Sequence, residues 1–106
     1  IRSPDAAWVS PERWAALTLP QKGAFAEVCP DFALELRSGS DALRPLQAKM
    51  QEYLANGARL GWLINPQDQQ VEIYRAGRSV EVLAQPDQLL GEDVLQGLVL
   101  ELRRIL

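Results

Sequence analysis

The sequence contains no histidine, and this absence removes several classes of catalytic site at once. Ser-His-Asp and Cys-His catalysis, histidine acting as a general base and zinc held by histidine all need an imidazole. Cys29 is the only cysteine, so no intrachain disulfide can form within residues 1–106 and a cytoplasmic setting is expected. The side chains that remain for chemistry are carboxylates, lysine and arginine, which work with hard cations.

Long apolar runs are also absent. None approaches the roughly 18 residues that a membrane-spanning helix needs, and no secretory signal pattern is visible, so no membrane partner is expected. The net charge is −3 and the isoelectric point is near 4.9, so DNA binding would need a local basic patch. With 47% hydrophobic and 24% charged residues among 106, the composition predicts one globular domain.

The most informative stretch runs from residue 30 to 38 and is predicted to be a buried strand. Its apolar side chains share one parity and face one side of a sheet: Phe32, Leu34 and Leu36. The other parity contains Asp31, Ala33, Glu35 and Arg37. Glu35 therefore lies in mid-strand between two leucines, where a lone carboxylate is costly unless it is paired or binds a metal.

A helix is predicted over residues 43–56, with Asp41 as its N-cap and Gly57 as its C-terminal cap. Its apolar stripe consists of Leu43, Leu46, Met50, Tyr53 and Leu54. We expect this stripe to pack on Phe32, Leu34 or Leu36, or on Trp62 and Ile64. Lys49 lies at the edge of the stripe, so the helix can return a lysine to the strand that carries Glu35.

The remaining elements are weaker predictions. The expected elements are a strand at 6–9, a helix capped by Ser10 that ends before Pro20, a loop at 21–23, strands at 60–64, 71–74 and 79–83, a helical turn at 87–90, and a strand or helix at 98–102; residues 24–28 stay ambiguous. The strand, helix and strand up to residue 64 predict a right-handed crossover with parallel strands. Residues 71–74 should pair antiparallel with 60–64.

Two carboxylates on neighbouring strands, together with a lysine, suit hydrolysis of a phosphodiester with a divalent metal. Asp5 follows Pro4 at the start of one predicted strand, and Glu35 lies within another. If those strands are neighbours, the two carboxylates can share one ion.

These residues occur within a longer pattern that resembles a known family. The pattern comprises residues 3–5 (Ser-Pro-Asp), 30–38, 40–41, 47–54, 56–66 and 71–75, in this order along nearly the whole sequence. On these residues the sequence resembles the Uma-two family of restriction-endonuclease-type proteins, in the PD-(D/E)XK nuclease superfamily.

The resemblance implies an α/β fold, a restriction-endonuclease-like mixed sheet with flanking helices, and DNA cleavage that depends on Mg²⁺ or Mn²⁺. Asp5 and Glu35 would be the metal ligands and Lys49 the catalytic lysine. The superfamily pattern places its lysine two residues after the glutamate, where this sequence has Arg37. The resemblance also implies that residues 1–106 are the C-terminal portion of a nuclease domain whose N-terminal part is missing, and a homodimer is expected to cover the exposed sheet.

Structural alternatives stay open for each of these residues. Glu35 can simply pair with Arg37, Lys49 can be a solvated surface charge, and Asp31 can serve only as a cap or turn residue. The tryptophans, Trp8, Trp14 and Trp62, are expected in the core. The alternative function is a catalytically inactive nuclease-fold module that binds nucleic acid or protein.

Overall fold

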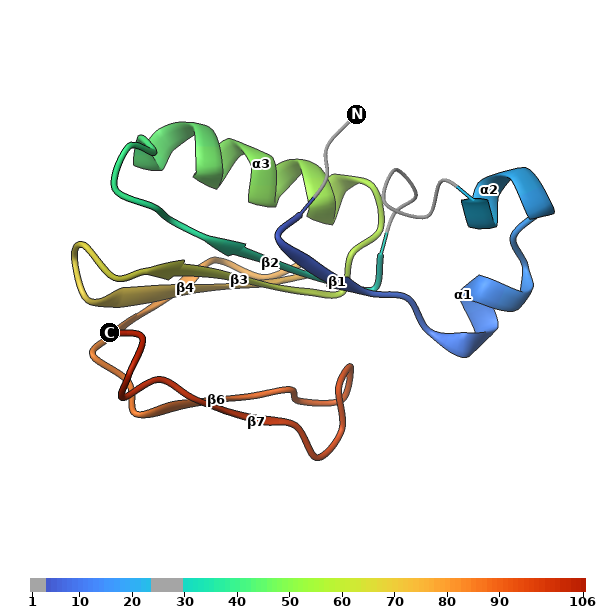
Figure 1. Ribbon diagram of the computed structural model, residues 1–106. Helices are drawn as coiled ribbons and strands as arrows, with labels where there is room; N and C mark the ends of the chain where they lie inside the picture. The colour runs from blue at the N-terminus through green and yellow to red at the C-terminus, as the bar shows by residue number, and fades with distance from the viewer. Residues whose placement is uncertain (1–3, 24–29) are drawn as a thin grey trace.

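A five-stranded mixed sheet forms the centre of the computed structural model, which describes residues 4–23 and 30–106 (Figure 1). In spatial order, which is also chain order, its strands are β1 (Ala6–Trp8), β2 (Phe32–Leu36), β3 (Leu60–Asn65), β4 (Gln70–Arg75) and β5 (Glu81–Ala84). β2 and β3 are parallel, and the other three pairs are antiparallel. The parallel unit and the β3–β4 hairpin are as the sequence predicts. The ambiguous stretch 24–28 lies outside the described residues.

Two short helices follow β1. α1 (Pro11–Ala15) begins as predicted, because the Ser10 hydroxyl accepts a hydrogen bond of 3.3 Å from the Arg13 N–H and Pro11 occupies the first turn. α2 (Leu19–Gly23) contradicts the prediction that residues 21–23 form a loop. Pro20 does not end a helix here. It lies in the first turn of a new one, where its missing N–H has no intrahelical partner to lose.

The long helix α3 (Leu43–Ala55) lies over one face of the sheet (Figure 1). Its C-terminus has the expected glycine cap: Gly57 has a φ of 109°, and the N–H groups of Gly57 and Ala58 donate to the carbonyls of Leu54 and Tyr53. The predicted N-cap is wrong. Ala42 occupies that position without a side-chain bond, and Asp41 instead accepts hydrogen bonds from Ser38 in the preceding loop.

The two faces of the sheet have separate cores. The face under α3 is built from Ala33, Leu46, Met50, Tyr53, Ala58, Leu63 and Tyr74. The opposite face is built from Phe32, Leu60, Trp62, Ile64, Val71, Ile73, Leu89 and Leu102. Met50 is fully buried, as expected of a core helix. The predicted partners of the helix were wrong, since Phe32, Trp62 and Ile64 belong to the other face.

A glycine allows the close approach of α3 to the sheet. A Cβ atom added at Gly61 of β3 would lie 2.5 Å from the terminal methyl of Met50. The helix therefore packs on the parity that contains Ala33 and Glu35, which has small residues at the contact. This placement puts Glu35 directly beneath the helix.

A small hairpin covers the opposite face, formed by β6 (Gln88–Leu90) and β7 (Val99–Glu101) (Figure 1). β6 replaces the helical turn predicted at 87–90, because Leu89 is buried in the sheet core while Leu90 points outward. Arg75 of β4 ties this hairpin to the sheet through an ion pair of 2.8 Å with Glu92, and it also pairs with Glu81 of β5 at 2.9 Å.

The three tryptophans differ in burial. Trp62 is buried, and Trp8 packs partly buried against the sheet core, but Trp14 is 38% exposed. The expectation that all three lie in the core was therefore wrong for Trp14. The Lys22 ammonium lies 5.6 Å from the Trp14 ring centroid, a cation–π contact.

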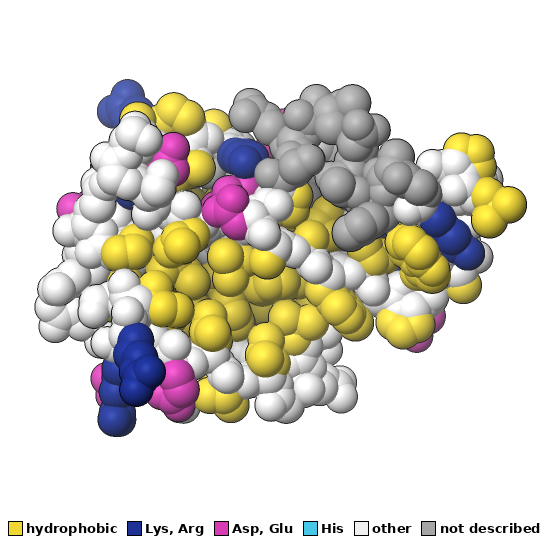
Figure 2. Space-filling model, viewed as in Figure 1, with side chains coloured by type: hydrophobic (Ala, Val, Ile, Leu, Met, Phe, Trp, Pro, Cys, Tyr) yellow, Lys and Arg dark blue, Asp and Glu magenta, His cyan; other side chains and the backbone are white. Residues whose placement is uncertain are grey.

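Within the described part of the chain, no helix is both long and apolar enough to cross a membrane. Figure 2 shows hydrophobic side chains gathered across the middle of one face of the molecule.

Candidate active site

A buried ion pair joins the strand and the helix that the sequence singled out. The Lys49 Nζ lies 2.8 Å from Oε1 of Glu35, and the Glu35 side chain is 2% exposed. The predicted proximity of Lys49 to Glu35 is therefore confirmed. The position of Lys49 on the helix explains this contact. Lys49 lies on the flank of the buried stripe, so its aliphatic chain crosses apolar surface and its ammonium reaches the sheet.

Tyr53 provides a second donor to the same carboxylate. Its hydroxyl donates to Oε1 of Glu35 over 2.8 Å. Both bonds end on Oε1, so neither occupies Oε2. The apolar pattern predicted only a core role for Tyr53. A signal was present, because Lys49 and Tyr53 are four residues apart and so share one side of the helix.

Asp5 directly precedes the neighbouring strand, β1. β1 and β2 pair with Ala6 opposite Leu34, and the same register continued by one residue puts Asp5 opposite Glu35. Directly opposed residues lie on one face, with Cβ atoms about 5 Å apart. The Asp5 carboxylate is exposed and is held by the Leu36 N–H, which donates to Oδ2 over 2.8 Å. The fold thus brings together Asp5, Glu35 and Lys49.

These three side chains border an open cavity of about 520 Å³ at the β1–β2 edge of the sheet, near the start of α3. The cavity is lined by Asp5, Ala6, Leu34, Glu35, Leu36, Ser38, Asp41, Leu46 and Lys49. Hydrogen bonds from the Ser38 N–H and hydroxyl lower the pKa of Asp41, assisted by the charges of Lys49 and Arg37. Asp41 is thus an anion at the rim of the cavity, already bound by Ser38.

Few side chains at this cavity could bind a metal ion. Within residues 4–23 and 30–106, no group of three or more histidine, cysteine, aspartate or glutamate side chains is close enough to hold an ion. The described part of the site therefore offers the pair Asp5 and Glu35. Two carboxylates fit Mg²⁺ and Mn²⁺, because such ions retain several waters and need few protein ligands.

Arg37, at the position of the superfamily lysine, is directed away from the cavity. Its Nη1 donates to Oδ1 of Asn65 and to Oδ2 of Asp68, each over 3.2 Å, and its Nε donates to the Asp41 carbonyl over 3.1 Å. The alternative pairing of Glu35 with Arg37 is therefore not formed. Arg37 instead joins the end of β2 to the β3–β4 turn.

Asp31 has a larger structural role than the cap or turn that the sequence suggested. It is 2% exposed, and the Ser10 N–H donates to its Oδ2 over 2.6 Å. The guanidinium groups of Arg13 and Arg59 each lie 3.1 Å from its Oδ1. Burial alone would raise the pKa of Asp31, but the bonds from Ser10 and the two arginines outweigh burial and lower it.

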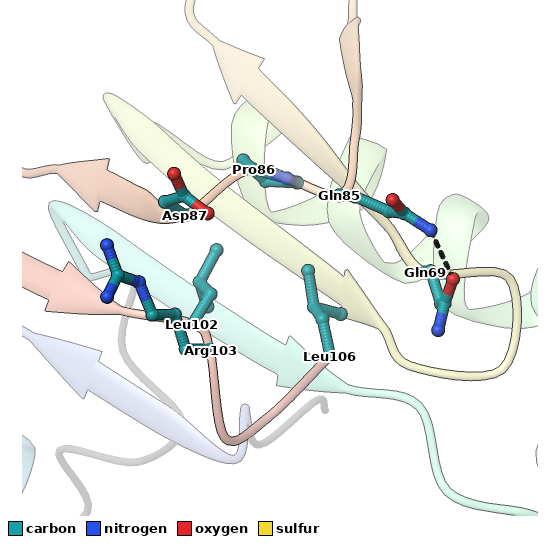
Figure 3. A pocket seen from close by; sticks show the side chains of 7 residues that line it. All are labelled: Gln69, Gln85, Pro86, Asp87, Leu102, Arg103 and Leu106. Carbon is teal, nitrogen blue, oxygen red and sulfur yellow. Dashed lines mark hydrogen bonds between the residues drawn. The ribbon is translucent and has the colours of Figure 1, made fainter.

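A second hollow, at the other face of the sheet, lacks this chemistry. It measures about 320 Å³ and is lined by Gln69, Gln85, Pro86, Asp87, Leu102, Arg103 and Leu106 (Figure 3). Gln85 donates to the side chain of Gln69 across its rim, and Asp87 is its one carboxylate. It offers no pair of acidic ligands.

Comparison with known proteins gives the family and a neighbour of the fold. A family model described as "Uma2: Putative restriction endonuclease" matches residues 1–103. The chain belongs to the Uma2 family. No curated protein matches it. Among solved structures, this Uma2 chain is similar to "a putative nuclease belonging to DUF820 from Anabaena variabilis ATCC 29413", with 32% identity and a TM-score of 0.54.

That alignment covers 59% of the Uma2 chain and 35% of the neighbour's chain. The α/β fold, a mixed sheet with flanking helices like that of a nuclease, is therefore as the sequence predicted. The comparisons thus give the family of the chain and the likeness of its fold to that neighbour.

Proposed function

We propose that this Uma2 protein is an endonuclease that hydrolyses phosphodiester bonds in DNA with Mg²⁺ or Mn²⁺. One observation carries the proposal: the Lys49 ammonium lies on the buried Glu35 carboxylate, at a cavity that Asp5 also lines. A buried charge is costly, and a buried lysine–glutamate pair that borders a cavity is a feature of functional sites. The family description and the nuclease-like neighbour support the same reaction class.

Asp5 and Glu35 would hold the metal ion. Hard carboxylate oxygens suit Mg²⁺, and the two groups lie on one face of adjacent strands. When bound, the ion would polarise the phosphate and lower the pKa of a coordinated water. Tyr53 keeps Glu35 oriented by donating to Oε1, on the oxygen that Lys49 also contacts.

Lys49 would supply the catalytic cation. Its side chain is 19% exposed and lines the cavity, so its ammonium can meet a phosphate oxygen or an attacking water there. An amine can carry a proton in one state and release it in another, whereas a guanidinium remains protonated. Lys49 can therefore both balance charge on the phosphate and position the nucleophile.

A homodimer stays a prediction. Among the residues that the structure describes, β1 is one of the two outer strands of the sheet, and an outer strand presents unpaired backbone groups that another chain can cover. Hydrophobic side chains gather over the middle of the face shown in Figure 2. Sedimentation velocity of the full-length protein measures the oligomeric state, and a monomer at all concentrations tested would contradict the prediction.

The proposed function is tested by metal binding and cleavage on one set of variants. Asp5→Asn and Glu35→Gln should each weaken Mn²⁺ binding measured by calorimetry, and should each lower Mg²⁺-dependent nicking of plasmid DNA by about 100-fold or more. Glu101→Gln is the matched control, because Glu101 is an exposed carboxylate on β7, at the opposite face of the sheet from α3.

A wild-type protein that binds no Mn²⁺ and cleaves no DNA would refute this function. The inactive nuclease-fold module would then be the better description. If both carboxylate variants bind Mn²⁺ as tightly as the wild type and still cleave DNA, then Asp5 and Glu35 do not hold the metal, and the metal site lies elsewhere.

A further inference from the structure

A second buried carboxylate lies under α3, on the side of the helix opposite to Glu35. In the sheet registers Glu35 is opposite Leu63, and Leu63 is opposite Glu72. The three residues form a row on one face, which puts the two glutamates roughly 10 Å apart across two strand spacings. Glu72 is 5% exposed. The helix therefore lies between two buried glutamates.

Glu72 is held by neutral donors. The Gln47 side-chain amide donates to Oε2 over 2.9 Å, and the Tyr74 hydroxyl donates to Oε1 over 2.6 Å. Burial, with the bond to Glu72, raises the pKa of Tyr74, so this hydroxyl remains a donor. The group borders a hollow of about 410 Å³ that also exposes Gln51, Val80 and Val82.

Gln47 and Lys49 lie on opposite flanks of the buried face of α3. The side chains of residues two positions apart point in directions that differ by about 200° around the helix axis. The buried residues Leu46, Met50 and Tyr53 lie between these two flanks. A rotation of α3 that lifts Gln47 away from Glu72 therefore changes the position of Lys49 over Glu35.

We propose that the Gln47–Glu72 hydrogen bond fixes the rotation of α3 about its axis and so positions Lys49 for catalysis. Gln47 and Glu72 are positioning residues. This inference rests on the proposed function of Lys49, and it extends the site to residues that do not touch the reacting atoms.

The apolar contacts of α3 cannot set this angle as sharply, since hydrophobic packing is non-directional. A rotation of about 20° moves an atom roughly 8 Å from a helix axis by about 3 Å, which is enough to break a hydrogen bond. In the described part of the chain, the other two polar contacts of α3 with this face, from Lys49 and from Tyr53, both end on Glu35, which would itself engage the metal. The Gln47–Glu72 bond is outside the chemistry and persists through it.

The test uses a swap of the two side chains in the full-length protein. Gln47→Leu removes the donor while keeping the size of the side chain. Gln47→Glu combined with Glu72→Gln exchanges the carboxylate and the amide, which restores the bond with its polarity reversed. Gln51→Leu is the control, because Gln51 borders the same hollow one turn further along the helix. Thermal unfolding of each variant shows that the measurements are made on folded protein.

Lysine acetylation reports the position of Lys49 without any need for activity. The sequence has two lysines, Lys22 and Lys49, so Lys22 is an internal reference. With N-hydroxysuccinimide acetate and peptide mass spectrometry, the Lys49-to-Lys22 labelling ratio should rise several-fold in Gln47→Leu. It should return to the wild-type value in the swapped protein and stay there in Gln51→Leu.

Cleavage kinetics give the second readout. In Gln47→Leu, kcat should fall by about 10- to 100-fold with KM within about twofold, because a misplaced catalytic group lowers the rate more than it lowers binding. The swap should recover most of the loss. If Gln47→Leu does not fold, Gln47→Glu alone is used, since it places a second carboxylate against Glu72.

Either of two results overturns the inference: an unchanged labelling ratio in the folded variant, or a raised ratio with unchanged kcat. A wild-type protein without metal-dependent cleavage refutes the proposed function instead. In that case the labelling ratio still decides whether Gln47 positions Lys49.

Discussion

The Lys49 ammonium lies 2.8 Å from Oε1 of Glu35, and this bond links α3 to β2, the second strand of the sheet. Glu35 is buried, so the bond compensates a charge that would otherwise be costly inside the protein. The same contact keeps a lysine at a cavity bordered by Asp5. One interaction therefore serves the fold and the proposed site.

Lys49 and Arg37 should give different phenotypes. Lys49→Ala should lower Mg²⁺-dependent cleavage by about 100-fold or more, the usual loss on removing a proton-transfer group. Lys49→Arg should remain folded but largely inactive, since a guanidinium keeps its proton. Arg37→Ala should mainly destabilise the protein, by about 1 kcal/mol, through its lost contacts with Asn65 and Asp68.

The measurements are initial rates of plasmid nicking and chemical denaturation of each variant. The reverse pattern, with Arg37→Ala inactive and Lys49→Ala active, would assign the catalytic cation to Arg37 and restore the spacing of the superfamily pattern.

Met50 and Gly61 should be coupled. Met50→Ala should cost about 2–4 kcal/mol of unfolding free energy, because the side chain is fully buried under α3. Gly61→Ala should cost about 1–3 kcal/mol on its own, since the new methyl would lie 2.5 Å from the end of Met50. In the double variant the added methyl enters space that Met50 has vacated.

The double variant should therefore be more stable than the sum of the single effects predicts, by about 1 kcal/mol or more. Urea denaturation measures all three proteins. Strict additivity would show that the two side chains do not compete for the same space.

The buried Asp31 should make stability depend on acid. Its pKa is lower in the folded protein than the ordinary value of 3.8, since the bonds from Ser10 and the charges of Arg13 and Arg59 outweigh burial. A group with a lowered folded-state pKa contributes its full stabilisation when the pH is above its pKa in the unfolded protein. This stabilisation is lost as the pH falls through the pKa of the folded protein.

Asp31→Asn should thus destabilise the protein by about 1–3 kcal/mol at pH 7, and the difference from wild type should shrink as the pH falls below about 4. Urea denaturation from pH 7 to pH 3 measures this. Asp93→Asn, at an exposed position, is the control. A wild-type–variant difference that is constant over this range would contradict the proposed role of the ionised carboxylate.

The unit from β2 to β4 was predictable because its signals are local. Alternation along 31–37 identifies a strand and puts Glu35 on a defined face, since side chains alternate from one residue to the next. The 3.6-residue period places Lys49 on the flank of the buried stripe of α3, and Gly57 supplies the conformation that ends the helix. These features together gave the correct pairing of Lys49 with Glu35.

Other features depended on partners that lie far away in the sequence. The parity of β2 does not say which of its faces receives α3, and that choice followed from the small residues Ala33 and Gly61. The same holds at 87–90, where only the sheet core that buries Leu89 selects a strand over a turn.

Charged side chains were the least predictable, because several partners lay within reach of each. Arg37 donates hydrogen bonds to Asn65 and Asp68 at the β3–β4 turn. Asp31 forms ion pairs with Arg13 and Arg59, which come from two other segments. A long, flexible charged group goes where burial and hydrogen bonding favour it most. The sequence by itself determined which residues could form the site, and the tertiary structure decided which of them meet.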